Sequence, residues 1–492
     1  MEDLLVNTRR KVLFTLICFF ILLSAGKVHV KAAAVDSAVE VFKDCLVYSF
    51  DMESIKNDKI VVNWSYKNNY TTDSDHGDYS NPFIDIQGFE IQVCRDKNYP
   101  ADQVKTYKLN KYVESADGGK YSYKIPVSVL GKNGGKLYGR IRAYGTIKTI
   151  EAGYDSGEPT TLQVGDVVYS GYQDLNCWHG YTTYSNFEEE MGRDHCEYVK
   201  INKTNFGGMY ALIKDGFYYC DSKGKKSYYD KNHDGWLDPA EIKEIYTLNN
   251  YSYKKYASGY EMLWGTEMYQ CKISDLKGLK YLPFVTSIDL RDYTGTKLDL
   301  TDYPHIRTVS MCEFWKSKFQ LIAPYAKQIK INSETGGSWK KAKLSSVDVS
   351  KCKAVVYLTL GGSYFKPMTM KLPASAKNLR WLSISYDSGK KIDLNKYKKL
   401  NLAYFYANKY SECKFNQCTR LNYVYFYCMD NLRSVDLRNA KSLKGADIYC
   451  CNNLSSSGLK TVKGTRVTKN QGRWWESTDT WRKLFDDIYK SM

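Results

Sequence analysis

The sequence predicts a multidomain, mainly β protein whose larger part is a solenoid of short repeats. One pattern of apolar residues returns eight times between Val285 and Cys451. Before residue 165 the chain contains short segments in which polar and apolar residues alternate, as half-buried strands require. Hydrophobic residues make up 43% of the chain and charged residues 25%, a composition typical of folded proteins.

In chain order we expect six segments, and the length of 492 residues allows several separate cores. They are a signal peptide (1–34), a β-sandwich (35–165), an irregular connector (166–229), a cation-binding loop with its helix (230–250), the solenoid (270–460) and a C-terminal cap (461–492).

The N-terminus has the three parts of a secretory signal peptide. Basic residues lie between Asn7 and Lys11, residues 12–25 are apolar or small, and Lys31-Ala32-Ala33-Ala34 offers a small-residue cleavage site. The apolar run is shorter than the roughly 20 residues that a membrane-spanning helix needs. We therefore expect an exported protein without a transmembrane anchor, either secreted or held non-covalently at the cell surface.

Four strands with alternating polarity are predicted in the N-terminal domain, at 59–64, 86–93, 121–125 and 137–144. Regular short strands of this kind favour a β-sandwich. The residues resemble a fibronectin type III domain. Trp64 matches the second-strand tryptophan of that family, Gly88-Phe89-Glu90-Ile91 its G-Y-E-I strand, and 138–144 its Y-x-V-R-V-x-A strand. The resemblance implies a spacer or a binding module, and we identify no catalytic group in it.

The connector contains residues of the types that bind zinc, namely Cys177, His179, His195 and Cys196. Their spacing departs from the C-x(2–4)-C and H-x(3–5)-H pairs of zinc sites, so a structural role is favoured. Cys177 and Cys196 are the one pair for which we consider a disulfide. The other cysteines of the exported chain are expected mainly to be small, buried apolar residues.

Residues 230–241 match a calcium-binding loop of the EF-hand type. Oxygen ligands fall at positions 1, 3, 5, 9 and 12, and Gly235 at position 6 permits the sharp turn. The expected ligands are the side chains of Asp230, Asn232, Asp234, Asp238 and Glu241 and the backbone carbonyl of Trp236. Pro239 and the apolar face ending at Tyr246 predict a helix after the loop, whereas a helix before it is hard to identify. We therefore expect one structural Ca²⁺ in a lone half of an EF-hand; a generic acidic turn is the alternative.

The repeats fit the template L-x-x-L-x-L-x-x-N of leucine-rich repeats, and their intervals lie within the range of roughly 20–29 residues typical of that architecture. The first positions are Val285, Ile306, Ala326, Val355, Leu379, Leu400, Leu421 and Leu443. A second apolar triplet, such as Leu298-Asp299-Leu300, recurs ahead of most units and predicts a short strand or turn. We expect an α/β leucine-rich-repeat solenoid. A capping helix is predicted after it, where Trp481, Leu484, Phe485 and Ile488 recur at helical spacing.

The template places the third, fifth and seventh residues of each unit on the concave face of the sheet. Aromatic residues gather there in the later repeats, as one contiguous platform, and are the expected ligand-binding residues: Tyr357, Trp381, Tyr404, Tyr406, Tyr423, Tyr425, Tyr427 and Tyr449. Exposed aromatic rings suit sugar faces and protein hot spots alike. The alternative is that the rings only brace neighbouring strands, at about 0.2–1 kcal/mol for each pair.

From about residue 200 to 492 the order of motifs resembles the exported leucine-rich-repeat proteins of Gram-positive bacteria. The resemblance rests on Thr204-Asn205-Phe206, the loop 230–241 and the I-x-x-L-K-G-L lead-in at 273–279. In that family these motifs precede the solenoid. Two features depart from the pattern: the third repeat begins at Ala326, and 329–355 carries an insertion that leaves the register of 315–350 open.

The formal net charge of +17 favours anionic partners such as acidic glycans or cell-wall polymers. No nucleic-acid-binding module occurs, so nucleic acid is not an expected partner. The six histidines fall in no G-x-S-x-G or H-E-x-x-H setting, and solenoids lack the enclosed pocket that most catalysis uses. We therefore expect a monomeric, non-enzymatic binding protein for a protein or glycan ligand. The alternatives are an enzyme whose active site lies in 166–229 and a purely structural scaffold at the cell surface.

Overall fold

The computed structural model describes residues 47–66, 83–110, 113–114, 120–152, 159–175, 195–219, 226–250, 271–333, 343–363 and 366–470. The expected signal peptide and the expected capping helix lie outside these residues. The chain divides into two compact units, Met1–Val199 and Lys200–Met492, and each is described by itself. Within the described residues, no helix has the length and apolar character needed to cross a membrane.

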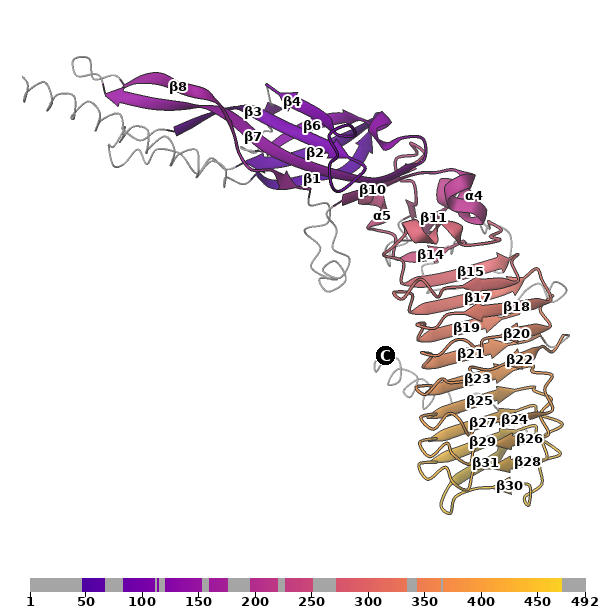
Figure 1. Cartoon of the computed structure of the whole chain (residues 1–492). Helices are drawn as coiled ribbons and strands as arrows, with labels where there is room; N and C mark the ends of the chain where they lie inside the picture. The colour runs from indigo at the N-terminus through magenta and orange to yellow at the C-terminus, as the bar shows by residue number, and fades with distance from the viewer. Residues whose placement is uncertain are drawn as a thin grey trace, which may run out of the picture. The chain divides into compact units, whose positions relative to one another are not determined.

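The first unit contains two antiparallel β-sheets (Figure 1). One sheet has the order β1-β2-β6-β5; the other has the order β10-β7-β3-β4, and β8 and β9 also pair with β7. The elements are β1 (Val47–Lys56), β2 (Lys59–Tyr66), β3 (Phe83–Cys94), β4 (Lys105–Leu109), β5 (Val113–Glu114), β6 (Lys120–Pro126), η1 (Val127–Leu130), β7 (Gly134–Ala152), β8 (Pro159–Tyr169), β9 (Gln173–Asp174) and β10 (His195–Lys200). The four strands predicted from the sequence are parts of β2, β3, β6 and β7.

An aromatic cluster joins the two sheets of the first unit. Trp64 of β2 lies edge-on to Phe89 of β3, with ring centres 5.4 Å apart, and stacks on Tyr121 of β6 at 5.8 Å. All three side chains are buried. Because Trp64 and Phe89 belong to different sheets, their contact shows that the apolar faces of the sheets pack on each other.

The second unit begins with short elements that lead into the solenoid. They are α3 (Lys203–Phe206), η2 (Gly207–Met209), α4 (Tyr210–Asp215), β11 (Phe217–Tyr219), β12 (Lys226–Tyr228), β13 (Trp236–Leu237), α5 (Pro239–Ile242) and η3 (Lys277–Tyr281). The ring of Phe206 lies so close to Gly278 that a Cβ there would come within 2.3 Å of it, which only glycine permits. Two motifs that are distant in the sequence, around Phe206 and around Gly278, therefore pack together.

The solenoid is built on a ten-stranded parallel sheet to which each turn adds one strand (Figure 1). The strands are β14 (Thr247–Asn249), β15 (Ser287–Tyr293), β17 (Thr308–Phe314), β19 (Gln328–Asn332), β21 (Tyr357–Gly361), β23 (Trp381–Ser385), β25 (Leu402–Tyr406), β27 (Tyr423–Tyr427), β29 (Gly445–Tyr449) and β31 (Arg466–Asn470).

The pairing register of this sheet is the one that the repeat template predicts. The fourth residues of successive units are direct neighbours, and all are buried: Ile288, Val309, Ile329, Leu358, Leu382, Ala403, Val424 and Ala446. The pairing of β19 with β21 has no shift, so the insertion between them leaves the register intact. The third repeat is a regular turn of the solenoid.

The far side of the turns consists of strands, so the expected α/β form of the solenoid is wrong. Two four-stranded parallel sheets lie there. Their strands are β16 (Lys297–Asp299), β18 (Lys318–Ile322), β20 (Ser346–Asp348), β22 (Thr369–Lys371), β24 (Lys391–Asp393), β26 (Glu412–Lys414), β28 (Ser434–Asp436) and β30 (Leu459–Lys460). The apolar-polar-apolar triplets explain this, because three alternating residues let a strand bury one side, whereas a helix needs a longer apolar stripe.

The main sheet extends beyond the expected solenoid at both ends. β14 comes from the segment assigned to the cation loop and its helix, and β31 comes from the segment assigned to the cap. The helix expected to reach Tyr246 ends at Ile242, because the chain enters β14 at Thr247. The template missed this first turn because a buried asparagine, Asn250, follows β14. Its Nδ2 donates to the carbonyls of Cys271 at 2.7 Å and Arg291 at 2.6 Å.

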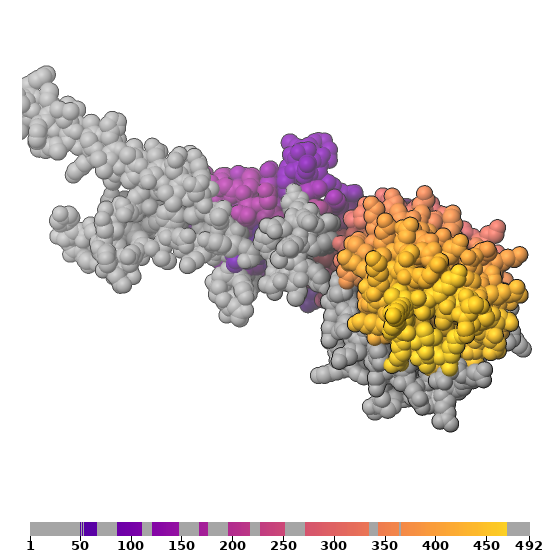
Figure 2. Space-filling model, turned by 90° about the horizontal axis from the view of Figure 1, so that it is seen from below, coloured from indigo at the N-terminus to yellow at the C-terminus, as the bar shows by residue number. Residues whose placement is uncertain are grey.

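Side chains fill the interior of the solenoid. In the view from below, the last turns, coloured yellow, form the end of the solenoid nearest the viewer (Figure 2). Phe405 of β25 stacks on Phe426 of β27 with ring centres 5.4 Å apart, and both are fully buried. Each turn therefore extends the core of the previous one, as the stability of a repeat protein requires.

Asn408 provides a test of this stacking. It is 2% exposed, its Oδ1 accepts a hydrogen bond from the Asp387 N–H at 2.7 Å, and its Nδ2 donates to the Ile384 carbonyl at 2.9 Å. We expect Asn408→Ala to lower the free energy of unfolding by about 2–4 kcal/mol, because two buried backbone groups lose their partner. Denaturant-induced unfolding measures the change. The exposed Asn431→Ala is the matched control, and its stability is expected within about 0.5 kcal/mol of wild type. Equal stability of the two variants would show that the hydrogen bonds of Asn408 do not stabilise the solenoid.

Candidate ligand-binding surface and cation loop

The concave tyrosines of the last repeats stack across β25, β27 and β29. Tyr404 lies over Tyr425 with ring centres 4.9 Å apart and planes at 8°, and Tyr406 lies over Tyr427 at 5.0 Å and 15°. The ring of Tyr449 lies 5.6 Å from Tyr425 and 6.2 Å from Tyr427. This geometry follows from the register, because Tyr404 pairs with Tyr425 and Tyr406 with Tyr427.

These rings are less exposed than the sequence predicts. Tyr425 and Tyr449 are each 6% exposed, and Tyr404, Tyr406 and Tyr427 are half-buried. Burial raises the pKa of Tyr404 to about 12 and raises that of Tyr425 further. The hydroxyls of Tyr404 and Tyr425 are therefore neutral at physiological pH and can both donate and accept hydrogen bonds.

The aromatic residues do not form one contiguous platform. Tyr357 of β21 stacks on Trp381 of β23 with ring centres 5.3 Å apart. Leu402, which pairs with both Trp381 and Tyr423, is buried and interrupts the column at the third position. A residue that the template did not single out extends the later group, since the ring of Tyr386 lies edge-on to Tyr406 at 5.1 Å.

The cation loop is closed by hydrogen bonds from its own backbone. Asp230 Oδ2 accepts from the Gly235 N–H at 3.0 Å, and Asp234 Oδ1 accepts from the Trp236 N–H at 2.8 Å. Gly235 has a φ of +79°, a conformation that glycine adopts without strain. The second oxygen of Asp230, Oδ1, is buried without a hydrogen-bond partner. A buried carboxylate oxygen of this kind requires a positively charged or hydrogen-bonding partner.

Asp238 and Glu241 cap the helix that follows the loop. Asp238 Oδ1 accepts from the Glu241 N–H at 3.0 Å, while the Glu241 oxygens accept from the N–H groups of Lys231 at 2.7 Å and Asp238 at 3.2 Å. Burial, together with the Asp238 carboxylate, raises the pKa of Glu241 to about 8. Burial also raises the pKa of Asp230 and of Asp234. Burial outweighs the opposing effects of the backbone hydrogen bonds to Asp230 and of the Lys200 charge near Asp234.

No three His, Cys, Asp or Glu side chains are arranged to hold a metal ion anywhere in the described part of the chain. Two of the expected calcium ligands, the Asn232 side chain and the Trp236 backbone carbonyl, are not among these four side-chain types. Both Glu241 oxygens face backbone N–H groups. A carboxylate oxygen has more than one lone pair, so it can accept an N–H and bind a cation together. The orphaned Asp230 oxygen and the donor set fit calcium, and the site remains a prediction.

Cys196 forms a disulfide, and because the nine other described cysteines are free, its partner lies outside the described residues. A disulfide sulfur is not a thiolate ligand, so Cys196 does not form a zinc site with His195. Cys177 and His179 lie outside the described residues, and the Cys177–Cys196 pairing remains a prediction. Seven of the nine free cysteines are buried, which confirms their expected role as apolar residues.

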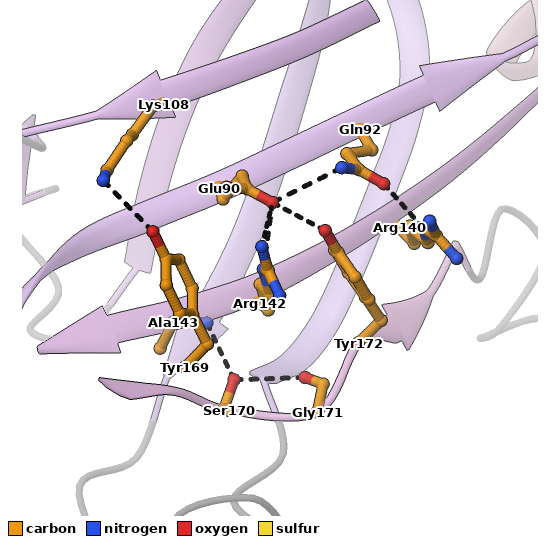
Figure 3. A network of polar contacts seen from close by, with 10 residues as sticks. All are labelled: Glu90, Gln92, Lys108, Arg140, Arg142, Ala143, Tyr169, Ser170, Gly171 and Tyr172. Carbon is orange, nitrogen blue, oxygen red and sulfur yellow. Dashed lines mark hydrogen bonds and ion pairs between the residues drawn. The ribbon is translucent and has the colours of Figure 1, made fainter. Parts of the chain in front are cut away.

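A cation–aromatic network on β3 and β7 of the first unit was not among the sites predicted from the sequence (Figure 3). Glu90 is 7% exposed and accepts hydrogen bonds from Arg142 Nε at 2.9 Å and the Tyr172 hydroxyl at 2.6 Å. The Arg142 guanidinium lies 4.0 Å from the ring centre of Tyr169, and that of Arg140 lies 4.1 Å from Tyr172.

The sequence does contain a signal for this network. Glu90 and Gln92 alternate on β3 and pair in register with Arg142 and Arg140 on β7, and Arg140 Nε donates to Gln92 Oε1 at 2.8 Å. Directly paired residues of neighbouring strands lie on the same face, so the Glu90 carboxylate meets Arg142 and the Gln92 amide meets Arg140. Because the carboxylate already binds Arg142 and Tyr172, the network acts as a structural clamp between strands.

No model of a known protein family matches the chain, and no curated protein matches it. Among solved structures, the chain is similar to the functional domain of InlJ from Listeria monocytogenes, which is described as including a cysteine ladder. The two share 10% identity, and the match covers 55% of this chain and 72% of that chain with a TM-score of 0.18. At this TM-score the likeness carries no argument about function.

The clamp at Glu90 is tested by Glu90→Gln in the full chain. We expect the free energy of unfolding of the first unit to fall by about 1–3 kcal/mol, because the half-buried Arg142 guanidinium and Tyr172 hydroxyl lose a charged acceptor. Thermal unfolding followed by circular dichroism measures the effect. Asp102→Asn, an exposed acid of the same unit, is the control and should leave the transition in place. An unchanged transition in Glu90→Gln would show that the carboxylate contributes nothing.

Proposed function

We propose that the chain is an exported, non-enzymatic binding protein whose solenoid recognises a protein or glycan ligand on its concave surface. The observation that supports this most is the stacked set Tyr404, Tyr406, Tyr425, Tyr427 and Tyr449. Rings stacked on adjacent strands of one sheet cover each other's faces and present their edges and hydroxyls in a fixed array. Such an array binds with little loss of side-chain entropy, because its rotamers are already restricted. Export rests on the signal pattern in residues 1–34.

A structural scaffold is the competing function, and one observation favours it. Tyr425 and Tyr449 are almost fully buried, as expected of rings that brace strands and do not contact a ligand. The half-buried Tyr406 and Tyr427 can distinguish the two functions. Removing a ring that only braces strands lowers stability, whereas removing a ring that binds ligand also lowers affinity.

We also propose that the first unit is a fibronectin type III-like module that acts as a spacer or as a second binding unit. Its strand order supports this, with β1, β2 and β6 adjacent in one sheet and β4, β3, β7 and β8 adjacent in the other. The buried Trp64 on the second strand is a further point of agreement.

We further propose that residues 230–241 bind one Ca²⁺ through Asp230, Asn232, Asp234, Asp238, Glu241 and the carbonyl of Trp236. The orphaned Asp230 oxygen and the burial of three carboxylates support this assignment. A bound cation would supply the positive charge that these side chains lack. Its role would be structural, because the helix that follows the loop leads directly into β14, the first strand of the solenoid sheet.

The double variant Tyr406→Ala/Tyr427→Ala tests binding against bracing. The proposal expects at least about a tenfold loss of affinity for the neutral glycans that the wild type captures on an array, together with about 1–2 kcal/mol of destabilisation from the lost stacking. Array binding and thermal unfolding are measured on the same preparations. The exposed pair Tyr228→Ala/Tyr246→Ala is the matched control and should retain affinity. Lower stability with unchanged binding would leave only the scaffold function.

Titration calorimetry tests the calcium site. We expect the wild type to bind one Ca²⁺ with a dissociation constant on the order of 10⁻⁴–10⁻³ M, the range of extracellular calcium modules. At about ten times this concentration the second unit should gain about 1.4 kcal/mol of stability. Asp230→Ala should abolish both effects, whereas the exposed Asp302→Ala should change neither. Equal heats from wild type and Asp230→Ala, or no heat at millimolar calcium, would end the proposal.

A further inference from the structure

One edge of the solenoid carries a concentrated array of positive charge. Eight turns there connect the short strands of the far side to the next strands of the main sheet. The first, 300–307, holds one Arg and one Asp, and the seven that follow carry the charge. They are 323–327, 349–356, 372–380, 394–401, 415–422, 437–444 and 461–465. Together they hold thirteen Lys or Arg residues and no Asp or Glu. These seven turns are named the basic edge.

Nearly all of these cations are exposed to solvent. The twelve exposed residues are Lys327, Lys351, Lys353, Lys377, Lys396, Lys398, Lys399, Arg420, Arg438, Lys441, Lys444 and Lys463. The seven turns at the opposite edge from 315–317 onward differ. The segments 315–317, 333–345, 362–368, 386–390, 407–411, 428–433 and 450–458 hold eight Lys or Arg and three Asp or Glu. The net charge of the solenoid is therefore concentrated on one side of its turns.

The turns of the basic edge stack in a continuous column. The Lys327 N–H donates to the Arg307 carbonyl at 2.8 Å, and the Val356 N–H donates to the Lys327 carbonyl at 2.8 Å. The same bond continues at 2.8–2.9 Å through Arg380, Asn401, Asn422 and Lys444. Because neighbouring strands lie about 4.8 Å apart, the edge extends about 30 Å from its first turn to its last.

The charges of the basic edge contrast with those of the far-side strands. There, cations pair with carboxylates, as Lys371 does with Asp348 at 3.1 Å and Lys391 with Glu412 at 2.8 Å. On the basic edge, Lys399 Nζ donates to the neutral Asn378 side chain at 2.8 Å, and Arg438 pairs with Asp436 of β28. With no carboxylate in any of the seven turns, like charges face each other from turn to turn, which costs stability unless an anion is bound.

We propose that the basic edge binds a linear acidic polysaccharide that lies along the axis of the solenoid. This is a second surface, and it goes beyond ligand recognition by the concave tyrosines. A polymer fits because each turn presents cations about 4.8 Å beyond the previous turn, so many weak contacts act together. The counterions released when a polyanion displaces them supply much of the free energy of binding.

Other anionic partners fit the basic edge less well. A protein partner would need an apolar or aromatic centre, and single-stranded nucleic acid would need rings on which bases stack. Across the seven turns Tyr325 is the single exposed aromatic residue, while Tyr397 and Phe415 are buried. A membrane surface would need apolar side chains that insert between the lipids. To bind an acidic polysaccharide, a surface needs only regularly repeated positive charges with polar side chains beside them, and the basic edge has both.

The test uses the full exported chain and heparin, a linear sulfated polysaccharide, as the probe. The edge variant is Lys398→Gln/Lys399→Gln/Lys441→Gln/Lys444→Gln. The matched control removes four exposed cations from the opposite edge: Lys366→Gln/Lys390→Gln/Lys409→Gln/Arg433→Gln. Both variants lose the same net charge. We expect the edge variant to bind heparin about tenfold more weakly or worse, with a shallower dependence on salt, and the control to stay within about twofold of wild type.

Further arms separate the partner classes. Affinity should rise with the length of heparin fragments until they span about 30 Å, because shorter fragments reach fewer turns. The Tyr406→Ala/Tyr427→Ala variant should bind heparin as wild type does, which keeps this result independent of the concave surface.

Equal losses in the two quadruple variants would overturn the proposal, since net charge alone would explain them. Tighter binding of single-stranded DNA or of phosphatidylserine vesicles than of heparin, lost in the edge variant, would overturn the polysaccharide assignment. Circular dichroism confirms that each variant is folded.

Discussion

The solenoid depends on parallel pairing without a shift between every two neighbouring turns. Once one turn is in place, the fourth and sixth residues of the next template unit must lie beside it. A slip by one residue would turn every buried side chain of a strand toward solvent. The insertion after Asn332 is tolerated because it lies in the connection between β19 and β20, while β19 and β21 still pair residue for residue.

The same pairing creates the chemistry of both solenoid surfaces. Identical side chains at one template position must lie beside each other in successive turns, as β-strand spacing dictates. For rings this gives the attractive stacking of Tyr404 with Tyr425 and of Tyr406 with Tyr427. For lysines and arginines it gives the mutual repulsion of the basic edge. One geometric rule therefore produces a self-stabilised aromatic surface and a charged edge whose repulsion a polyanion relieves.

The corners of the turns impose a backbone conformation that side-chain type does not reveal. The eighth residue of six template units, at or just after the end of a strand of the main sheet, has φ between 49° and 57°: Asp292, Glu313, Tyr386, Ala407, Cys428 and Cys450. Non-glycine residues are uncommon in this region, and most belong to asparagine or aspartate. This conformation recurs at one position with four other residue types, which shows that the stacking of the turns imposes the corner. Tyr386 reaches the ring of Tyr406 from such a corner.

The sequence alone determined the period and the inward-facing residues of the solenoid, and its register outside 315–350, because these depend on a local alternation of apolar and polar residues. It also indicated the β-strands of the first unit and the buried cysteines. Tertiary structure decided the rest. Asn250 and β14 were missed because a buried asparagine replaces an apolar residue once its partners, the carbonyls of Cys271 and Arg291, are in place. The burial of Tyr425 and Tyr449 and the clamp at Glu90 depend likewise on which strands become neighbours. Spatial neighbours from distant segments set the exposure of a side chain and complete its hydrogen bonds, and a local pattern does not specify them.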